Sequence, residues 1–319
     1  MKKSTPKTFV LIATCLAIFS TALSAREIWK AGHIDIRVNY GEDGWVIDFH
    51  HEELGVRSTD EITLWVRGGE SNFALGAQQP MPDNPDLAFI GAQAGDPFWL
   101  LPSSEVSWLV WPGFAIEDTD SHWFQSYVEP DPRVSNTSTQ WVTVELLDVD
   151  FQGEGSGNLS MWQPGPNLFW STHDEPESGN KYYLFRGAHS HMNWAFSQPG
   201  LYEIEIQASA IPADDPDSRI YSDPVRIQFY VDSGPQLTVT DDQVRYEFPV
   251  KPNLGQTSLL IEASEDLATW QALASITGDR DIEVFDPAAD VQSIGDERVR
   301  LQMDAPEDSS RFFRLRLEE

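Results

Sequence analysis

Short runs in which apolar and polar residues alternate constrain the fold of this chain more than any other feature of its sequence. Because successive side chains of a β-strand point to opposite faces, each run predicts a strand with one buried face. No long stretch repeats its apolar residues with the period of a helix, and Gly, Pro, Asn and Asp separate the runs. The sequence therefore predicts an all-β protein, with its clearest strands at residues 34–40, 62–66, 142–146, 202–206 and 225–231.

The aromatic content and a break near residue 234 predict two β-sandwich domains. With 12 Trp and 17 Phe among 319 residues, the chain can fill a large core between two antiparallel sheets. A turn-forming stretch, Asp232-Ser233-Gly234-Pro235, separates the last long alternating run from another β-rich segment. We expect a main β-sandwich domain over residues 26–234 and a smaller, fibronectin-like β-sandwich over residues 235–319.

The first 25 residues have the pattern of a secretory signal peptide. Three lysines precede an apolar run over residues 9–19, and small residues follow up to Ala25. The run is too short and wrongly flanked for a membrane span. We predict a signal peptide at residues 1–25 and a protein that is secreted, periplasmic or held at the cell surface, with no membrane span after cleavage. The only cysteine, Cys15, lies in this segment, which excludes disulfides and thiolate ligands from the mature chain.

A strong negative charge limits the partners of this chain. It carries 51 Asp and Glu against 21 Lys and Arg, a formal net charge of −30. Such a potential repels phosphate backbones and anionic lipids, so nucleic acid and membrane surfaces are poor partners. Cations and neutral ligands are compatible with this charge. The ordinary alternative is a solvated acidic surface that keeps an extracellular protein soluble.

A turn at residues 41–44 predicts the first hairpin and its register. If Tyr40 lies opposite Trp45, the apolar residues of both strands fall on one face, and a slip by one residue would mix the two faces. The opposite face then carries three polar pairs: Arg37 with Asp48, Asp35 with His50, and His33 with Glu52.

Two further histidines, His189 and His191, stand two residues apart just before a clear strand pattern. On a strand they point to the same side and can present two imidazoles to one ligand. Imidazole and carboxylate are the ligands of zinc and related metals. We therefore predict a zinc or manganese site made of His33, Asp35, His50, His189 and His191. In this site Asp35 is either a ligand or the partner that fixes an imidazole tautomer. The ordinary alternative is a solvated sheet face.

The order of five sequence blocks between about residues 29 and 208 resembles the choice-of-anchor M domain. These blocks are Gly32-His33-Ile34-Asp35, Phe49-His50-His51-Glu52, Gly95-Asp96-Pro97-Phe98-Trp99-Leu100-Leu101-Pro102, Met161-Trp162-Gln163, and His189-Ser190-His191-Met192-Asn193-Trp194-Ala195-Phe196 followed by Pro199-Gly200-Leu201-Tyr202. Members are surface-anchored and are associated with ABC transporters of the metal-uptake type. The resemblance implies extracellular metal binding, with family histidines at His33, His50 or His51, His189 and His191. The chain departs from the family at its C-terminus, where the residues up to Glu319 contain no sorting signal or hydrophobic tail.

The last segment resembles a small C-terminal β module that is common in secreted proteins of verrucomicrobia and related bacteria. The resemblance rests on residues 258–270, which end in a phrase of the type Ala-Ser-x-Asp-Leu-x-x-Trp, and on the closing strand at residues 310–316. It implies an accessory or sorting domain without catalytic residues. Alternation at Phe313, Leu315 and Leu317 predicts that the closing strand lies at a sheet edge.

Three functions are consistent with these patterns. We expect a non-enzymatic, secreted or cell-surface protein that binds a transition metal in support of uptake and has metal ABC transporter components as partners. The alternative is a carbohydrate-binding or adhesion module that contacts a surface glycan through exposed aromatic residues, for which the loops with Asp118, Asp120, His122, Trp162, Trp170 and His173 are candidates. A hydrolase using Asp96 or Asp35 as a base is the third, but no nucleophile elbow, zincin helix or paired acidic motif supports it.

Overall fold

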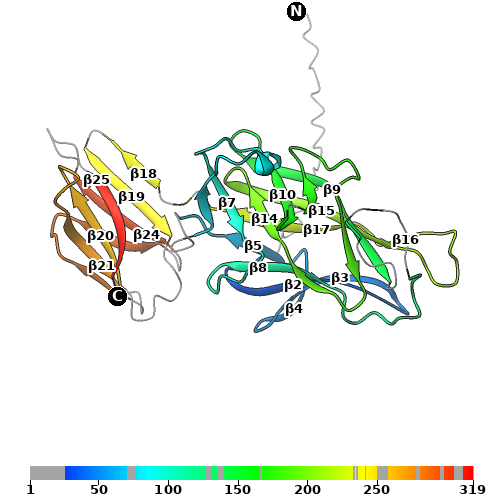
Figure 1. The fold of residues 1–319 in the computed structure, drawn as a ribbon. Coiled ribbons are helices and arrows are strands. Elements are labelled where there is room, and N and C mark those ends of the chain that lie inside the picture. Colours follow the sequence, from blue (N-terminus) through cyan, green and yellow to red (C-terminus); the bar gives the residue numbers. More distant parts are fainter. Residues whose placement is uncertain are drawn as a thin grey trace, which may run out of the picture.

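The structure is a computed structural model that describes residues 26–69, 76–126, 131, 133–134, 140–165, 167–232, 234, 236–240, 242–249, 258–277, 281–294, 298–304 and 312–318. The predicted signal peptide lies outside these residues. The regular secondary structure of the described chain is almost entirely β-strand, which confirms the all-β prediction (Figure 1). Its one helix is the short 3-10 turn η1 (Pro85–Ile90), which Asn84 caps by accepting a hydrogen bond from the backbone N–H of Asp86. No helix in this part of the chain is both long and apolar enough to span a membrane.

The largest sheet contains the longest strands. Its order is β1 (Glu27–Trp29), β5 (Ile62–Val66), β17 (Val225–Val231), β15 (Gly200–Ala210), β9 (Trp141–Gly153) and β12 (Lys181–Phe185), and β16 (Ile220–Tyr221) also pairs with β15. The pairs of β5 with β1 and with β17 are parallel. Four of the five strands predicted most clearly from alternation lie in this sheet.

A second sheet carries the first hairpin. Its order is β13 (His189–His191), β8 (Val110–Ala115), β2 (Gly32–Gly41), β3 (Gly44–His51) and β4 (Gly55–Ser58). Strand β8 lies parallel to β2 and antiparallel to β13. The two segments with the predicted metal ligands therefore belong to one sheet, separated by a single strand.

A third sheet completes the main domain. Its order is β11 (Asn167–Ser171), β10 (Leu159–Gln163), β14 (Asn193–Phe196), β7 (Pro97–Leu101) and β6 (Gln78–Pro80). Aromatic side chains from all three sheets meet in one core. Phe114 of β8 packs on Trp170 of β11 with ring centroids 5.7 Å apart, and Trp194 of β14 packs on Phe229 of β17 at 5.4 Å. Burial of these large rings is the main driving force for holding the sheets together.

The predicted register of the first hairpin is confirmed, since Tyr40 pairs with Trp45 and Asp35 with His50. The apolar face is fully buried at Ile34, Ile36, Val38 and Phe49.

The predicted pair of His33 with Glu52 does not form, because β3 ends at His51 and Glu52 lies in the exposed turn that follows. The His51 Nδ1 atom accepts hydrogen bonds from the backbone N–H groups of Glu53 and Leu54, which bends the chain away from β2.

The C-terminal segment forms two further four-stranded sheets. One has the order β18 (Gln236–Val239), β19 (Gln243–Pro249), β24 (Arg298–Asp304) and β23 (Asp290–Ile294); the other has β22 (Ile282–Val284), β21 (Gln271–Ile276), β20 (Ser258–Ser264) and β25 (Phe312–Glu318). Strand β25 lies at a sheet edge, as predicted.

The two C-terminal sheets share a core of their own, which includes Phe248, Ile261 and Leu301. Next to the junction with the main domain, Arg298 donates two hydrogen bonds to the buried carboxylate of Asp232, at 2.8 and 2.7 Å. The domain boundary at residue 234 stays a prediction. The separate cores before and after this residue are consistent with it.

Candidate metal centre

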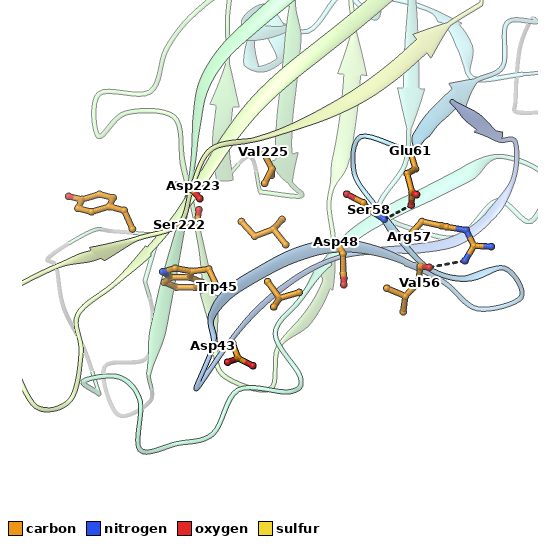
Figure 2. A pocket seen from close by; sticks show the side chains of 13 residues that line it. Asp43, Trp45, Asp48, Val56, Arg57, Ser58, Glu61, Ser222, Asp223 and Val225 are labelled. Atoms are coloured by element: carbon orange, nitrogen blue, oxygen red, sulfur yellow. Dashed lines mark hydrogen bonds between the residues drawn. The ribbon is translucent and has the colours of Figure 1, made fainter. Parts of the chain in front are cut away.

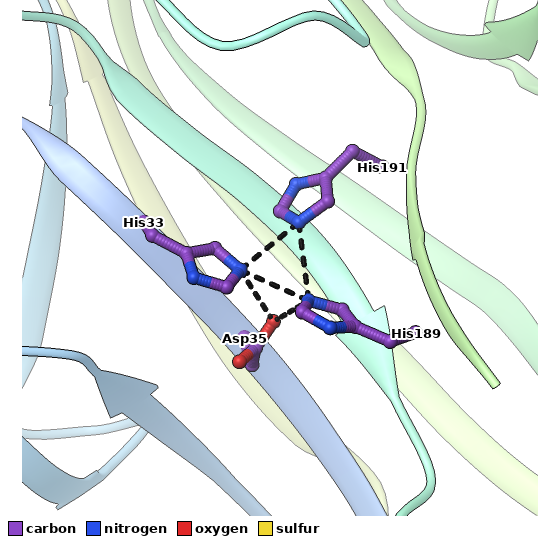
Figure 3. A group of neighbouring side chains, drawn as sticks. All are labelled: His33, Asp35, His189 and His191. Atoms are coloured by element: carbon purple, nitrogen blue, oxygen red, sulfur yellow. Dashed lines mark hydrogen bonds and ion pairs between the residues drawn. The ribbon is translucent and has the colours of Figure 1, made fainter. Parts of the chain in front are cut away.

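Three histidines and one aspartate converge on the face of the second sheet that points away from the core (Figure 3). His33 and Asp35 come from β2, and His189 and His191 come from β13. The register places Asp35, Gly113 of β8 and His191 in one row across the three strands. Residues two apart share a face of each strand, so all four side chains rise on the same side of β8.

The four donor atoms lie close together. His33 Nε2 is 2.9 Å from His189 Nε2 and 3.1 Å from His191 Nε2, and the last two atoms are 3.2 Å apart. The Asp35 Oδ1 atom is 2.7 Å from His189 Nε2 and 3.2 Å from His33 Nε2. One ligand atom from each of the four residues lies within 4.8 Å of the others.

Hydrogen bonding alone cannot satisfy this cluster. A neutral imidazole nitrogen either donates one N–H or offers one lone pair. The three Nε2 atoms contact one another, and each is either protonated or unprotonated. At least two of them must therefore be in the same state, so at least one contact sets N–H against N–H or lone pair against lone pair. The Asp35 Oδ1 atom is buried and makes no hydrogen bond of acceptable geometry. A cation between these atoms would accept all of their lone pairs, so the donor set fits a metal ion.

The strand between the ligand pairs is shaped to let His191 lie over it. A Cβ atom on Gly113 would stand 2.6 Å from Cε1 and 2.7 Å from Nδ1 of His191, so only glycine leaves room for the ring. Trp111, two residues earlier on β8, stacks on the same ring with centroids 3.6 Å apart and planes 13° apart. These two neighbours fix the position of the His191 imidazole.

Two more polar side chains touch the cluster from outside. The Glu117 Oε1 atom is 3.8 Å from His189 Nδ1, the ring nitrogen that faces away from the cluster. The His50 Nδ1 atom is 3.8 Å from Asp35 Oδ2, and 42% of the His50 side chain is exposed. At 3.8 Å both contacts are longer than a hydrogen bond, and a small movement would bring each group to the outer atom of a ligand, where such partners orient metal ligands. The structure therefore places His50 beside the carboxylate of Asp35 and not among the four converging donors.

The surroundings keep His191 in the form that binds metals. Burial, together with the neighbouring imidazoles of His33 and His189, lowers the pKa of His191 to about 4, although Asp35 opposes this shift. Neutral imidazole is the ligand form, so His191 offers a lone pair at neutral pH.

The histidine next to His50 has a structural role. His51 is buried, its Nε2 atom lies 3.0 Å from the carbonyl oxygen of Ala31, and its Nδ1 atom accepts from the backbone of the following turn. Of the two positions that the resemblance allowed for a family histidine, His50 is the one that faces the cluster.

The tryptophans are mostly core residues. All twelve lie in the described part of the chain, where eight are buried and four are half-buried. Trp162 and Trp170, which were candidates for a sugar-binding loop, are 6% and 0% exposed. They belong to the packed interior and form no exposed platform.

A separate groove lies between the first hairpin and the start of β17 (Figure 2). It has a volume of about 690 Å³ and combines carboxylates such as Asp43 and Asp223 with aromatic rings. The Trp45 ring is half-buried and stacks on Phe124, whereas Tyr221 is 56% exposed.

Comparisons with known proteins give no family. No family model and no curated protein matches the chain. A solved structure, the secreted serine protease VesC from Vibrio cholerae, aligns with 56% of this chain and 48% of its own, at 6% identity and a TM-score of 0.16. The alignment thus spans about half of that protein, and a likeness this weak carries no argument about fold or function. The resemblance to the choice-of-anchor M domain stays a prediction.

Proposed function

We propose that this protein binds one divalent transition-metal ion through His33, Asp35, His189 and His191. The observation that supports this most directly is the meeting of four donor atoms from segments 156 residues apart in sequence. Their hydrogen-bonding capacity cannot be satisfied within the group, whereas one cation would satisfy it.

The position of the cluster favours a binding role at the protein surface. The His33 and His189 side chains are 22% and 35% exposed, so an ion can reach them from solvent. The net charge of −30 raises the local concentration of cations around the molecule. We further propose a non-enzymatic role outside the cytoplasm in support of metal uptake, which rests on the predicted signal peptide and on the family resemblance.

Metal content and affinity test the proposal. The protein is purified without chelators, its metals are measured by elemental analysis, and Mn²⁺ and Zn²⁺ are then titrated into the metal-free protein by calorimetry. We expect one site per chain, and we expect its loss in the double variant His189→Ala/His191→Ala. The control is His122→Ala, because this side chain is 65% exposed and is not one of the converging donors. Unchanged stoichiometry in a double variant whose circular dichroism is native would contradict the assignment.

The groove beside Trp45 supports a second candidate, a carbohydrate-binding or adhesion function. An exposed aromatic ring with carboxylates around it is a suitable surface for sugar hydroxyls and C–H groups. A glycan array with the native protein tests this candidate, and Tyr221→Ala should remove any signal. Signals that are equal in this variant and the native protein would exclude the groove.

A further inference from the structure

We infer that the metal centre is built for right-angled, octahedral-type coordination, with two adjacent positions left for an oxygen ligand from outside the protein. This inference rests on the proposed metal binding and adds to it the geometry of the ion and the chemistry of what the ion would bind. It favours manganese or another six-coordinate divalent metal over zinc.

The distances between donor atoms favour right angles. With metal–ligand bonds of 2.0–2.1 Å, a tetrahedral site would separate its donors by about 3.3–3.4 Å, whereas right angles would separate neighbouring donors by about 2.8–3.0 Å. The three imidazole pairs measure 2.9, 3.1 and 3.2 Å. The two contacts of Asp35 Oδ1 measure 2.7 and 3.2 Å. All five are shorter than the tetrahedral value. The contacts of 2.7 and 2.9 Å match right angles or are shorter, and the other three, at 3.1–3.2 Å, lie between the right-angled and the tetrahedral value.

The sixth pair, Asp35 with His191, is different. Figure 3 joins every other pair of the four side chains by a dashed contact, but not this one, although their ligand atoms lie within 4.8 Å. Two donors on opposite sides of one ion would be about 4.0–4.2 Å apart. The sheet explains the arrangement, because Asp35 and His191 occupy the same row on the two strands that flank Gly113. They approach the space above this glycine from opposite directions.

These relations fit an octahedron around one ion. On it, the three imidazole nitrogens would share one triangular face, and Asp35 Oδ1 would lie opposite His191. The two vacant positions are then opposite His33 and His189, and they are adjacent to each other.

Among the described residues, no other His, Asp or Glu side chain joins the four ligands within 4.8 Å of one another, and His50 faces the outer Oδ2 atom of Asp35 at 3.8 Å. Gly113 has no side chain, and the indole N–H of Trp111 donates to the carbonyl oxygen of Ser103 at 3.2 Å. Glu117 stands behind the His189 ring at its Nδ1 atom. Water or an added ligand must therefore complete the coordination.

The metal and ligand classes follow from this geometry. Zinc in proteins prefers four tetrahedral ligands when the site is closed. Imidazole and carboxylate ligands around an ion with open positions are typical of ferrous iron, and carboxylate and water ligands suit manganese, so a six-coordinate divalent transition metal fits this donor set. Two adjacent open positions suit a chelating ligand with two oxygen atoms, such as a carboxylate or a hydroxy acid. The centre would thus recognise a metal together with a small oxygen chelator.

Cobalt spectroscopy of the full chain tests the inference. Co²⁺ is added to the metal-free protein, and the visible spectrum is corrected with that of the double variant His189→Ala/His191→Ala to remove cobalt bound elsewhere. We expect the weak absorption of six-coordinate cobalt, and we expect it to shift when acetohydroxamate, a chelator with two oxygen atoms, is added. With Mn²⁺, the bound ion should enhance the relaxation of water protons, and acetohydroxamate should reduce that enhancement.

The possible outcomes separate this inference from the proposed function. An intense, four-coordinate cobalt spectrum would overturn the octahedral geometry but leave metal binding intact. A spectrum or a relaxation enhancement that does not respond to acetohydroxamate would overturn the two open positions. If neither Co²⁺ nor Mn²⁺ binds to the native chain, both proposals fail.

Discussion

Replacing Gly113 by alanine is the most specific perturbation of the proposed centre, because it adds one methyl group under one ligand. The new Cβ atom would lie 2.6 Å from Cε1 of His191 and 2.8 Å from the backbone oxygen of Ser190. Ordinary contact needs about 3.4 Å or more, so the His191 ring must move by nearly an ångström. It cannot slide along the strand, since Trp111 already stacks against it at 3.6 Å.

Such a displacement should weaken metal binding without removing any ligand. Disturbing the groups that hold metal ligands typically lowers affinity 10- to 100-fold, and we expect a loss of about this size for Gly113→Ala. Overpacking should also lower the free energy of unfolding by about 1–3 kcal/mol. Calorimetric titration with Mn²⁺ measures the first effect and urea unfolding of the metal-free protein measures the second.

A glycine from the same sheet provides the control. Gly41 lies on β2, and a Cβ atom there would meet nothing within 4 Å. Gly41→Ala should therefore leave the affinity unchanged. If Gly113→Ala binds Mn²⁺ as tightly as Gly41→Ala does, the position assigned to His191 is wrong.

Three further predictions concern the surroundings of the centre and the domain junction. Glu117→Gln, which removes the charge beside His189 Nδ1, should weaken Mn²⁺ binding by up to about tenfold in calorimetry, and an unchanged affinity would show that Glu117 does not orient this ring. The pKa of His191 is lowered to about 4 in the folded protein, from about 6.5 in the unfolded chain. Between these two pH values only the unfolded chain binds a proton at His191, so the free energy of unfolding should fall as the pH falls across this range. Urea unfolding at several pH values in metal-free buffer should show a shallower pH dependence for His191→Gln, and parallel curves would refute this. Arg298→Ala leaves the 3% exposed carboxylate of Asp232 without its ion-pair partner and should lower the free energy of unfolding by about 3 kcal/mol; a change below about 1 kcal/mol in urea unfolding would show that solvent replaces the arginine.

The hairpin register could be predicted from the sequence because it depends on neighbouring residues. Alternation fixes which side chains share a face, and the turn at residues 41–44 fixes which residues lie opposite each other. The positions of Ile36 opposite Phe49 and of Asp35 opposite His50 follow from these two facts alone. The two halves of the site were likewise found as residue pairs, His33 with Asp35 and His189 with His191.

The neighbours of each strand could not be predicted in this way. The insertion of β8 between β2 and β13 joins segments far apart in the chain, and no local pattern marks it. This order also explains the place of His50. It lies on β3, three strands from β13, and with strands about 4.8 Å apart its ring reaches only the far oxygen of Asp35.

The sequence does not mark Glu117 as a neighbour of the site, because its position depends on the strand order. It becomes a neighbour of His189 only because Ala115, two residues before it, pairs with that histidine. The aromatic loops were ambiguous for another reason, since a tryptophan in a turn-rich segment can serve a core or a ligand, and only packing in three dimensions decides between them.

The separation of the ligands in sequence links metal supply to folding. His33 and His189 are 156 residues apart, so the unfolded chain does not hold them together and the ion would bind almost only to the folded protein. By mass action, free metal at a hundred times its dissociation constant would add about 2.7 kcal/mol to the free energy of unfolding. The strand that gains most is β13, which has three residues and one neighbour at the sheet edge. A bound metal ion would hold β13 against the rest of the sheet. The backbone amides of β13 would then exchange their hydrogens more slowly in metal-loaded protein than in metal-free protein.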